Sequence, residues 1–220
     1  MLREFSTEMT VAVPVQFHLV PPPRIPGAVA IVLHGYGSNK ERMLGLAREF
    51  VPETYGILSL QGMHQNTQIS RRTGTIYAGY GWGTADNLED AIALHHSALR
   101  KVIHSLLRRG IASRESIVLA GFSEPVLLNY SYAEDWGSSL AGVVGICGDI
   151  PIMKGSRRYP PMFHLAGASD PFASLPTLAS RVQAIQSVGI QLRFSIYEAG
   201  HEITAEMKRD VRGWLRRLQP

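Results

Sequence analysis

The amino-acid sequence predicts an α/β fold: one domain over residues 1–220, with a mostly parallel central sheet, helices on both faces and a minimal cap or none. Three observations support this class. Short apolar runs alternate with segments of helical periodicity, which implies right-handed crossovers between parallel strands. Hydrophobic residues make up 45% of the chain and charged residues 18%, as in ordinary globular proteins. At 220 residues, one domain can bury about 70% or more of the unfolded chain's surface.

Six apolar runs are predicted to be strands of this sheet. Each is short and bounded by polar residues or glycine, as expected for strands that helices cover on both faces. The N-terminal segment up to Val20 alternates apolar and polar residues after its charged start, which is typical of an edge strand. The six apolar runs cover residues 28–34, 55–60, 116–122, 141–148, 161–167 and 191–199.

Five segments with apolar residues at helical spacing are predicted to be helices. Before the first of them, Ser38 and Glu41 stand three residues apart, which is the pattern of a capping box. The longest has acidic residues near its start and Gly110 just after its end, which are typical helix boundaries. The predicted helices cover residues 38–50, 87–109, the stretch that begins near 123, 175–189 and 203–215.

The segment from Gln61 to Gly83 has no steady period and is predicted to be a long loop. It contains polar residues, glycines and aromatic residues. A loop of this length in a compact domain is usually functional or disordered. Because it follows a predicted strand, we expect it on the substrate side. There Trp82 would either line an acyl pocket or serve as a structural aromatic residue.

Composition excludes several functions. The formal net charge of +4 comes from scattered arginine pairs, and no nucleic-acid-binding module is recognisable, so we expect no nucleic-acid partner. The longest apolar stretches, of about ten residues, are too short to insert stably in a membrane. The N-terminus lacks the apolar block of a signal peptide, which predicts a cytoplasmic protein. Cys147 is the only cysteine, so neither an intrachain disulfide nor a cysteine metal cluster is expected.

Reactive side chains follow three of the predicted strands. Ser123 comes directly after the run 116–122, Asp170 after the run 161–167 and His201 after the run 191–199. The carboxyl ends of parallel strands are where sites form in such sheets. The chain order Ser, Asp, His is that of the α/β-hydrolase triad. The sequence therefore predicts a nucleophile, an orienting acid and a general base.

An acyl-transfer site also needs backbone donors for the oxyanion that forms on the substrate. The amide of Glu124, directly after the nucleophile, is one candidate. The amide of Tyr36, between two glycines after the first central strand, is the other. His34 either orients this second loop or makes a hydrogen bond in the core. No metal or cofactor is expected to take part.

The segments LHGYGSN, GFSEPV, GASDPFASL and YEAGHEI resemble the phospholipase/carboxylesterase group of α/β-hydrolases, which includes acyl-protein thioesterases. The resemblance covers roughly residues 28–217. It implies hydrolysis of small-molecule carboxylic esters or thioesters by Ser123, His201 and Asp170 without a metal or cofactor. Members typically carry Gly-Phe-Ser-Gln-Gly-Gly at the elbow, whereas this chain has Glu124, Pro125 and Val126 after its serine.

Several alternatives remain open on sequence alone. Asp149 follows another predicted strand and competes with Asp170 for the acid position. Ser123 could simply cap a helix. Cys147 lies in an apolar strand and is interpreted as a core residue, while His95, His96 and His104 are interpreted as packing or surface residues of the long helix. The altered elbow would also suit a catalytically weak or silent binding protein, and the same triad could support peptidase chemistry.

Overall fold

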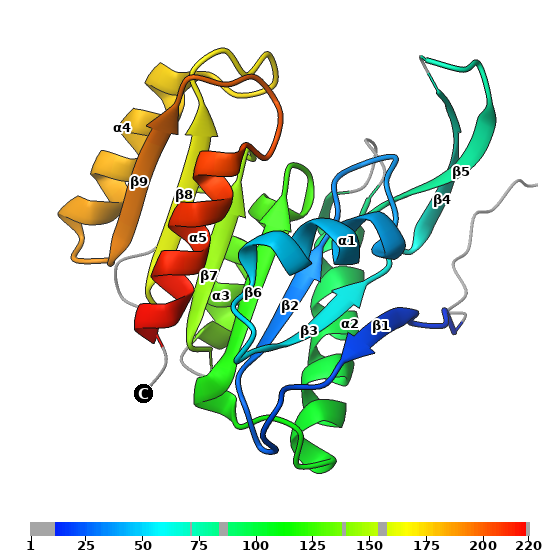
Figure 1. Ribbon diagram of the computed structural model, residues 1–220. Helices are drawn as coiled ribbons and strands as arrows, with labels where there is room; N and C mark the ends of the chain where they lie inside the picture. The colour runs from blue at the N-terminus through cyan, green and yellow to red at the C-terminus, as the bar shows by residue number, and fades with distance from the viewer. Residues whose placement is uncertain (1–11, 71, 84–87, 138–139, 154–157, 219–220) are drawn as a thin grey trace, which may run out of the picture.

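In the computed structural model, which describes residues 12–70, 72–83, 88–137, 140–153 and 158–218, the chain folds around a seven-stranded sheet (Figure 1). Its strand order is β1-β3-β2-β6-β7-β8-β9, with β1 antiparallel to β3 and every other neighbouring pair parallel. This confirms the predicted mostly parallel sheet. The strands are β1 (Phe17–Val20), β2 (Val29–Leu33), β3 (Gly56–Leu60), β6 (Ile117–Phe122), β7 (Gly142–Ile146), β8 (Met162–Gly167) and β9 (Leu192–Tyr197).

Helices cover both faces of the sheet, as predicted (Figure 1). Alternate residues of each central strand enter opposite core layers: Val29 and Ile31 of β2 pack with the layer of α2, α3 and α4, while Ala30 and Val32 pack with that of α1 and α5. Burial on both faces explains why these strands are continuous apolar runs. The helices are α1 (Lys40–Phe50), α2 (Leu88–Arg108), α3 (Pro125–Trp136), α4 (Leu175–Ser187) and α5 (Ala205–Leu218), and Arg114–Ser116 form a 3-10 turn.

The segment after β3 is a β-hairpin, so the prediction of an irregular loop over residues 61–83 was wrong. Strands β4 (His64–Ile69) and β5 (Ile76–Gly81) pair in antiparallel register and form a separate two-stranded sheet. Figure 1 shows this hairpin standing away from the body of the molecule. Since neither face of the hairpin is covered by a helix layer, its strands carry polar side chains and give no apolar period.

The start of α1 also differs from its prediction. The N-cap residue is Asn39, whose side-chain oxygen accepts a 2.9 Å hydrogen bond from the amide of Arg42. Asparagine caps a helix as well as serine does, and Asn39 has the extended backbone that a cap requires. The Glu41 carboxylate instead pairs with Lys40 and with His18 of the neighbouring strand. The predicted Ser38–Glu41 capping box is therefore wrong.

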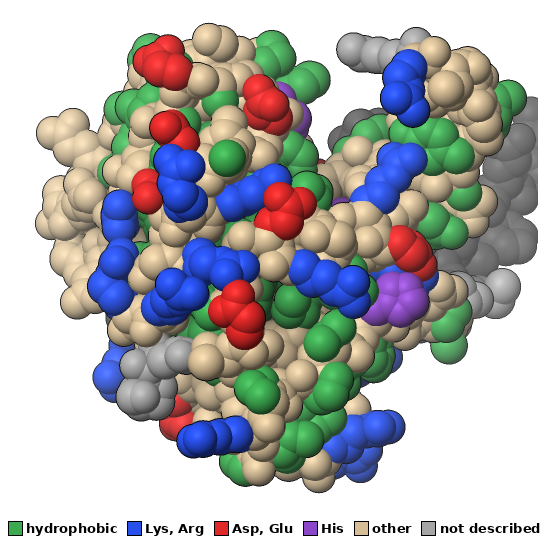
Figure 2. All heavy atoms as spheres, viewed as in Figure 1, with side chains coloured by type: hydrophobic (Ala, Val, Ile, Leu, Met, Phe, Trp, Pro, Cys, Tyr) green, Lys and Arg blue, Asp and Glu red, His purple; other side chains and the backbone are tan. Residues whose placement is uncertain are grey.

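Charges of both signs alternate over the face that α1 and α5 form (Figure 2). Lys208 of α5 pairs with Glu49 of α1 at 2.8 Å, and Arg212 pairs with Glu53 at 2.6 Å. Exposed pairs of this kind contribute little to stability. Each pair places a carboxylate beside a cation and so reduces the local positive charge of this face. Among the described helices, none combines the length and apolarity that crossing a bilayer requires.

Candidate active site

Ser123 lies at the sharp turn between β6 and α3, at the carboxyl edge of the sheet. Its φ angle is 66°, in the left-handed region that residues other than glycine rarely adopt. The amide of Ser123 donates a 2.8 Å hydrogen bond to the carbonyl of Ile146 in β7, and its own carbonyl accepts from Val126 at 3.1 Å. The strained turn of a nucleophile elbow, which exposes the serine hydroxyl above the sheet, has this conformation.

The structure brings Ser123, His201 and Asp170 together from three different loops. His201 Nε2 lies 2.8 Å from Ser123 Oγ, and His201 Nδ1 lies 2.8 Å from Asp170 Oδ2. The second oxygen of Asp170 accepts a 2.9 Å hydrogen bond from the amide of Phe172, and the carboxylate is fully buried. The rings of Phe122 and Phe172 lie 5.0 and 4.8 Å from the imidazole, so the histidine is held between two apolar surfaces.

Asp149, the competing acid, lies away from the imidazole. Its carboxylate pairs with Arg181 of α4 and accepts a 2.9 Å hydrogen bond from the amide of Ile150. More than half of the side chain is exposed. Of the two acids that follow neighbouring strands, only Asp170 contacts His201.

The two candidate oxyanion donors belong to two segments that meet at the serine. A Cβ atom added to Gly35 would lie 3.2 Å from Ser123 Cβ and 3.1 Å from the Phe122 ring, so the backbone before Tyr36 is in close contact with the elbow. A side chain at this position would require its neighbours to shift by a few tenths of an ångström. Among the hydrogen bonds of the described residues, none is donated by the amide of Tyr36 or of Glu124. Neither N–H group is therefore committed to a hydrogen-bond partner among the described residues.

Pro125 occupies the first position of α3, where its missing amide costs no helical hydrogen bond. Proline disfavours helical angles in the residue before it, yet Glu124 has φ −48° and ψ −49°. The surrounding fold overrides this local preference.

Val126 is the third departure from the family pattern at the elbow. Cβ atoms added to Gly145 and Gly148 would lie 2.7 and 2.4 Å from Val126. Two glycines on the neighbouring strand and its loop thus provide the space that the valine fills.

Trp82 and His34 lie behind the site and not on its open surface. Trp82 is fully buried, and its indole N–H donates a 2.7 Å hydrogen bond to the carbonyl of His34. His34 is 1% exposed, and Nδ1 donates to the carbonyl of Gly35 at 2.9 Å while Nε2 accepts from the amide of Gly62 at 3.0 Å. Burial lowers the pKa of His34, which favours the neutral ring that this pattern requires. Trp82 therefore serves as a structural aromatic residue and does not line a pocket surface, and His34 supports the Gly35 loop.

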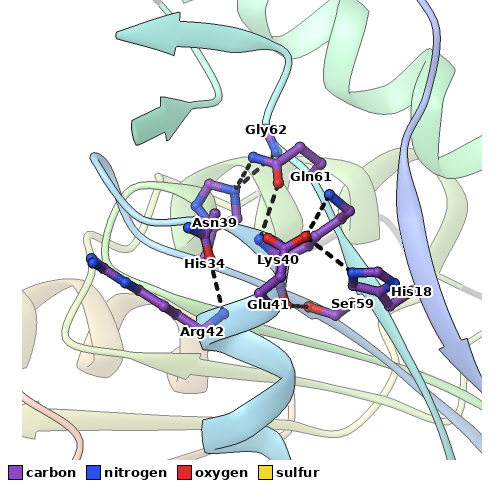
Figure 3. A network of polar contacts seen from close by, with 9 residues as sticks. All are labelled: His18, His34, Asn39, Lys40, Glu41, Arg42, Ser59, Gln61 and Gly62. Atoms are coloured by element: carbon purple, nitrogen blue, oxygen red, sulfur yellow. Dashed lines mark hydrogen bonds and ion pairs between the residues drawn. The ribbon is translucent and has the colours of Figure 1, made fainter. Parts of the chain in front are cut away.

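The support of His34 continues into α1 (Figure 3). The side-chain amide of Gln61 lies 3.2 Å from His34 Nε2, and its oxygen accepts from the amide of Lys40 at 3.1 Å. Ser59 donates a 2.8 Å hydrogen bond to the carbonyl of Lys40. The start of α1 and the loop that carries Gly35 are thus held by one set of hydrogen bonds.

A cavity of about 670 Å³ lies between the hairpin, the elbow and the start of α2. The sequence pattern did not predict most of its wall, because the hairpin has no apolar period and the leucines of α2 and α3 have the spacing of ordinary core residues. The aromatic and polar content of residues 61–83 was the only signal. Its lining residues are Tyr36, His64, Gln65, Asn66, Gly83, Leu88, Ala91, Glu124, Leu127 and Leu128.

The carboxylate of Glu124 is partly buried in the wall of this cavity. Its Oε1 accepts hydrogen bonds from the amides of Trp82 and Gly83 at 3.0 and 3.1 Å. Its Oε2 is buried and has no hydrogen-bond partner among the described residues. Burial raises the pKa of Glu124, and the two amide hydrogen bonds offset this shift in part.

The remaining candidate residues take no part in the proposed chemistry. Cys147 is buried beside the triad, where its thiol donates to the carbonyl of Glu202 at 3.5 Å and interacts with the Asp170 carboxylate. Burial and that carboxylate raise the pKa of Cys147 to about 11, so the thiol stays protonated and unreactive. His95 is fully buried against Trp82, and burial lowers its pKa to about 3. Within the described ranges, no group of three or more histidine, cysteine, aspartate or glutamate side chains could hold a metal ion.

A parallel sheet with helices on both faces and a Ser–His–Asp arrangement at its carboxyl edge defines the α/β-hydrolase class. The model of the family described as Phospholipase/Carboxylesterase matches residues 16–219, so the chain belongs to that family. It is a carboxylesterase-like hydrolase. Comparison with curated proteins gives no match.

Solved structures share the fold at low identity. The carboxylesterase of Bacillus cereus is 18% identical, with a TM-score of 0.73 over 93% of this chain and 95% of that one. Esterase PE8 is 17% identical, with a TM-score of 0.75 over 94% of this chain and 100% of its own. SOBER1 of Arabidopsis thaliana is 16% identical, with a TM-score of 0.70 over 87% and 98% of the two chains.

Proposed function

We propose that this chain is a serine esterase that hydrolyses carboxylic esters or thioesters through an acyl-enzyme on Ser123. The observation that carries the proposal is the continuous hydrogen-bonded chain from Ser123 Oγ to His201 and on to the buried Asp170, each contact 2.8 Å long. It starts from a serine held at φ 66° on an elbow. A helix-capping serine needs neither this backbone nor these partners.

In the proposed first half-reaction, Ser123 Oγ attacks the carbonyl carbon while His201 Nε2 takes the hydroxyl proton. Asp170 fixes the tautomer of the ring and stabilises the imidazolium that forms. The carbonyl oxygen becomes an oxyanion, which the amides of Tyr36 and Glu124 stabilise. When the tetrahedral intermediate collapses, the bond to the alcohol or thiol breaks and His201 returns the proton to that leaving group.

In the second half-reaction, water attacks the acyl-enzyme. His201 takes a proton from the water, a second oxyanion forms in the same hole, and collapse releases the carboxylic acid while Ser123 recovers its proton. The cavity beside Glu124 supports this assignment, since leucine and alanine side chains from α2 and α3 form much of its wall. An apolar pocket with few polar groups is the usual form of a small-molecule site.

Two measurements on the purified chain test the proposal. A fluorophosphonate probe should label the unaltered protein, and label should disappear in Ser123→Ala. The same variant should lose on the order of 10⁴-fold or more of its turnover of nitrophenyl esters. Ser187→Ala serves as the matched control, because Ser187 is exposed at the end of α4.

A folded protein that neither reacts with the probe nor hydrolyses any ester would contradict the proposal and favour a silent binding protein. A panel of acyl esters, acyl thioesters and aminoacyl amides then defines the class of leaving group. Preferential cleavage of the amides would replace the esterase assignment with a peptidase.

A further inference from the structure

Strand β4 begins, and strand β5 ends, next to the residues that hold or carry the two candidate oxyanion donors. We call Gly62 and residues 81–83 the hairpin base. On one side, the amide of Gly62 donates to His34 Nε2 at 3.0 Å, and the indole of Trp82 donates to the His34 carbonyl at 2.7 Å. On the other side, the amides of Trp82 and Gly83 donate to Glu124 Oε1 at 3.0 and 3.1 Å.

These contacts act on the two donors through short covalent paths. Glu124 carries one proposed donor on its own backbone, so a carboxylate fixed by two amides also restrains the residue that supplies this N–H. His34 holds the carbonyl of Gly35, which belongs to the same peptide unit as the amide of Tyr36. A rotation of that unit would turn the second donor away. The hairpin base therefore contacts His34, which holds the peptide unit of one donor, and the side chain of Glu124, whose backbone carries the other.

Close packing adds to the hydrogen bonds. A Cβ atom added to Gly81 would lie 3.0 Å from the Tyr36 ring and 3.3 Å from Glu124 Oε2, so this glycine lies between the two residues. A Cβ atom on Gly62 would lie 2.5 Å from the carbonyl of Gly81, which shows how closely the two strands of the base approach each other.

We propose that the hairpin base positions the oxyanion hole, with Trp82 and the carboxylate of Glu124 as its positioning residues. The inference rests on the proposed esterase function and deepens it. It explains why a carboxylate is kept in the wall with Oε2 buried and unpartnered among the described residues, an arrangement that costs stability. It also links substrate binding to catalysis, because His64, Gln65 and Asn66 of the same hairpin line the cavity.

The test compares Glu124→Leu, which removes the acceptor of the two amides, with Glu124→Gln, which keeps an acceptor oxygen at the same place. Glu115→Leu is the matched control, since Glu115 is exposed beside the amino-terminal end of β6. The measurements are kcat and KM for nitrophenyl butyrate, the inhibition constant of an alkyl trifluoromethyl ketone, and Tm. The ketone adds to Ser123 Oγ and places an oxyanion in the hole, so its affinity reports the donors directly.

For Glu124→Leu we expect kcat to fall about 10²-fold, the loss of one oxyanion donor, with KM within about threefold of the parent. Affinity for the ketone should fall in parallel, and Glu124→Gln should recover most of both. The proposal is overturned if folded Glu124→Leu keeps kcat within about threefold, or if Glu124→Gln is as impaired as the leucine variant. An inactive parent protein would overturn the esterase assignment as well, which separates the two failures.

A second pair of variants keeps the test open if Glu124→Leu does not fold. Trp82→Phe removes the indole hydrogen bond to His34 and retains an aromatic ring. Trp214→Phe is its control, a buried tryptophan of α5 that packs against Phe163 on the opposite face of the sheet. We expect about a tenfold loss of kcat and of ketone affinity in Trp82→Phe only. Equal effects of the two substitutions on kcat would refute the positioning assignment.

Discussion

Replacing Pro125 by glycine separates two effects of the proline at the elbow, on stability and on the oxyanion donor that precedes it. Pro125 is buried at the first position of α3. Removing the three ring methylenes costs about 2 kcal/mol of burial, and the freer unfolded chain costs about 1 kcal/mol more. Relief of the helical angles forced on Glu124 before a proline returns about 1 kcal/mol. We therefore expect Pro125→Gly to lose about 2 kcal/mol of unfolding free energy.

The turnover number of Pro125→Gly should change little, although its unfolding free energy falls. Glu124 already has helical angles, and its amide donates to no described residue, so glycine at position 125 adds no donor to the site. Urea denaturation followed by circular dichroism measures the first effect, and steady-state hydrolysis of nitrophenyl butyrate measures the second. We expect kcat to change less than about tenfold. A gain of about 10²-fold would refute the reasoning, because that is the size of a recovered oxyanion donor.

Three further predictions concern the triad, the cavity wall and α1. Asp170→Asn should lower kcat by about 10⁴-fold, because the amide favours the wrong tautomer of His201. Asp149→Asn alters only a half-exposed pair with Arg181, so its kcat should stay within about twofold of the parent. A larger loss of kcat at Asp149 than at Asp170 in the same ester assay would assign the acid position to Asp149. Burial raises the pKa of Glu124, so the unfolded chain releases this proton at lower pH than the folded protein does, and stability is lost as pH rises from the ordinary pKa of glutamate toward the raised one. In urea titrations, Glu124→Gln should therefore gain stability relative to the parent as pH rises above that ordinary pKa, and a difference that stays constant with pH would contradict the shift. Asn39→Ala should cost about 1 kcal/mol of unfolding free energy and Ser38→Ala much less, and the reverse order would restore the serine cap.

The central sheet could be predicted because its strands are buried on both faces. Runs such as Val29–Leu33 and Ile117–Phe122 have no polar residue within them, and their spacing with the helices determines a parallel topology. The residues at the carboxyl ends of these strands then become neighbours without further information. Ser123, Asp170 and His201 were predicted to lie together for that reason. The tertiary structure was needed to separate Asp170, which contacts His201, from Asp149, which pairs with Arg181, since both acids follow neighbouring strands.

The hairpin could not be predicted for the opposite reason. Its strands are stabilised by backbone pairing with each other, and the only cross-strand apolar pair, Ile69 with Ile76, lies at its outer end and is exposed. Side-chain pattern therefore says nothing about where the strands lie. The same holds for the carboxylate of Glu124, which was considered only for its backbone amide. Its contacts with Trp82 and Gly83 join segments about forty positions apart in the chain.

The fit of Val126 against Gly145 and Gly148 has a consequence for engineering this chain. In a library that varies position 126 alone, only side chains that fit the space above the two glycines are expected to be tolerated. In a library that adds a side chain at 145 or 148, every member has a steric clash. A smaller residue at 126 would not relieve these clashes, because a Cβ atom at 148 would also lie 2.6 Å from the carbonyl oxygen of Ser123 and one at 145 would lie 2.7 Å from the Tyr130 hydroxyl. Libraries should therefore keep both glycines and vary position 126 alone.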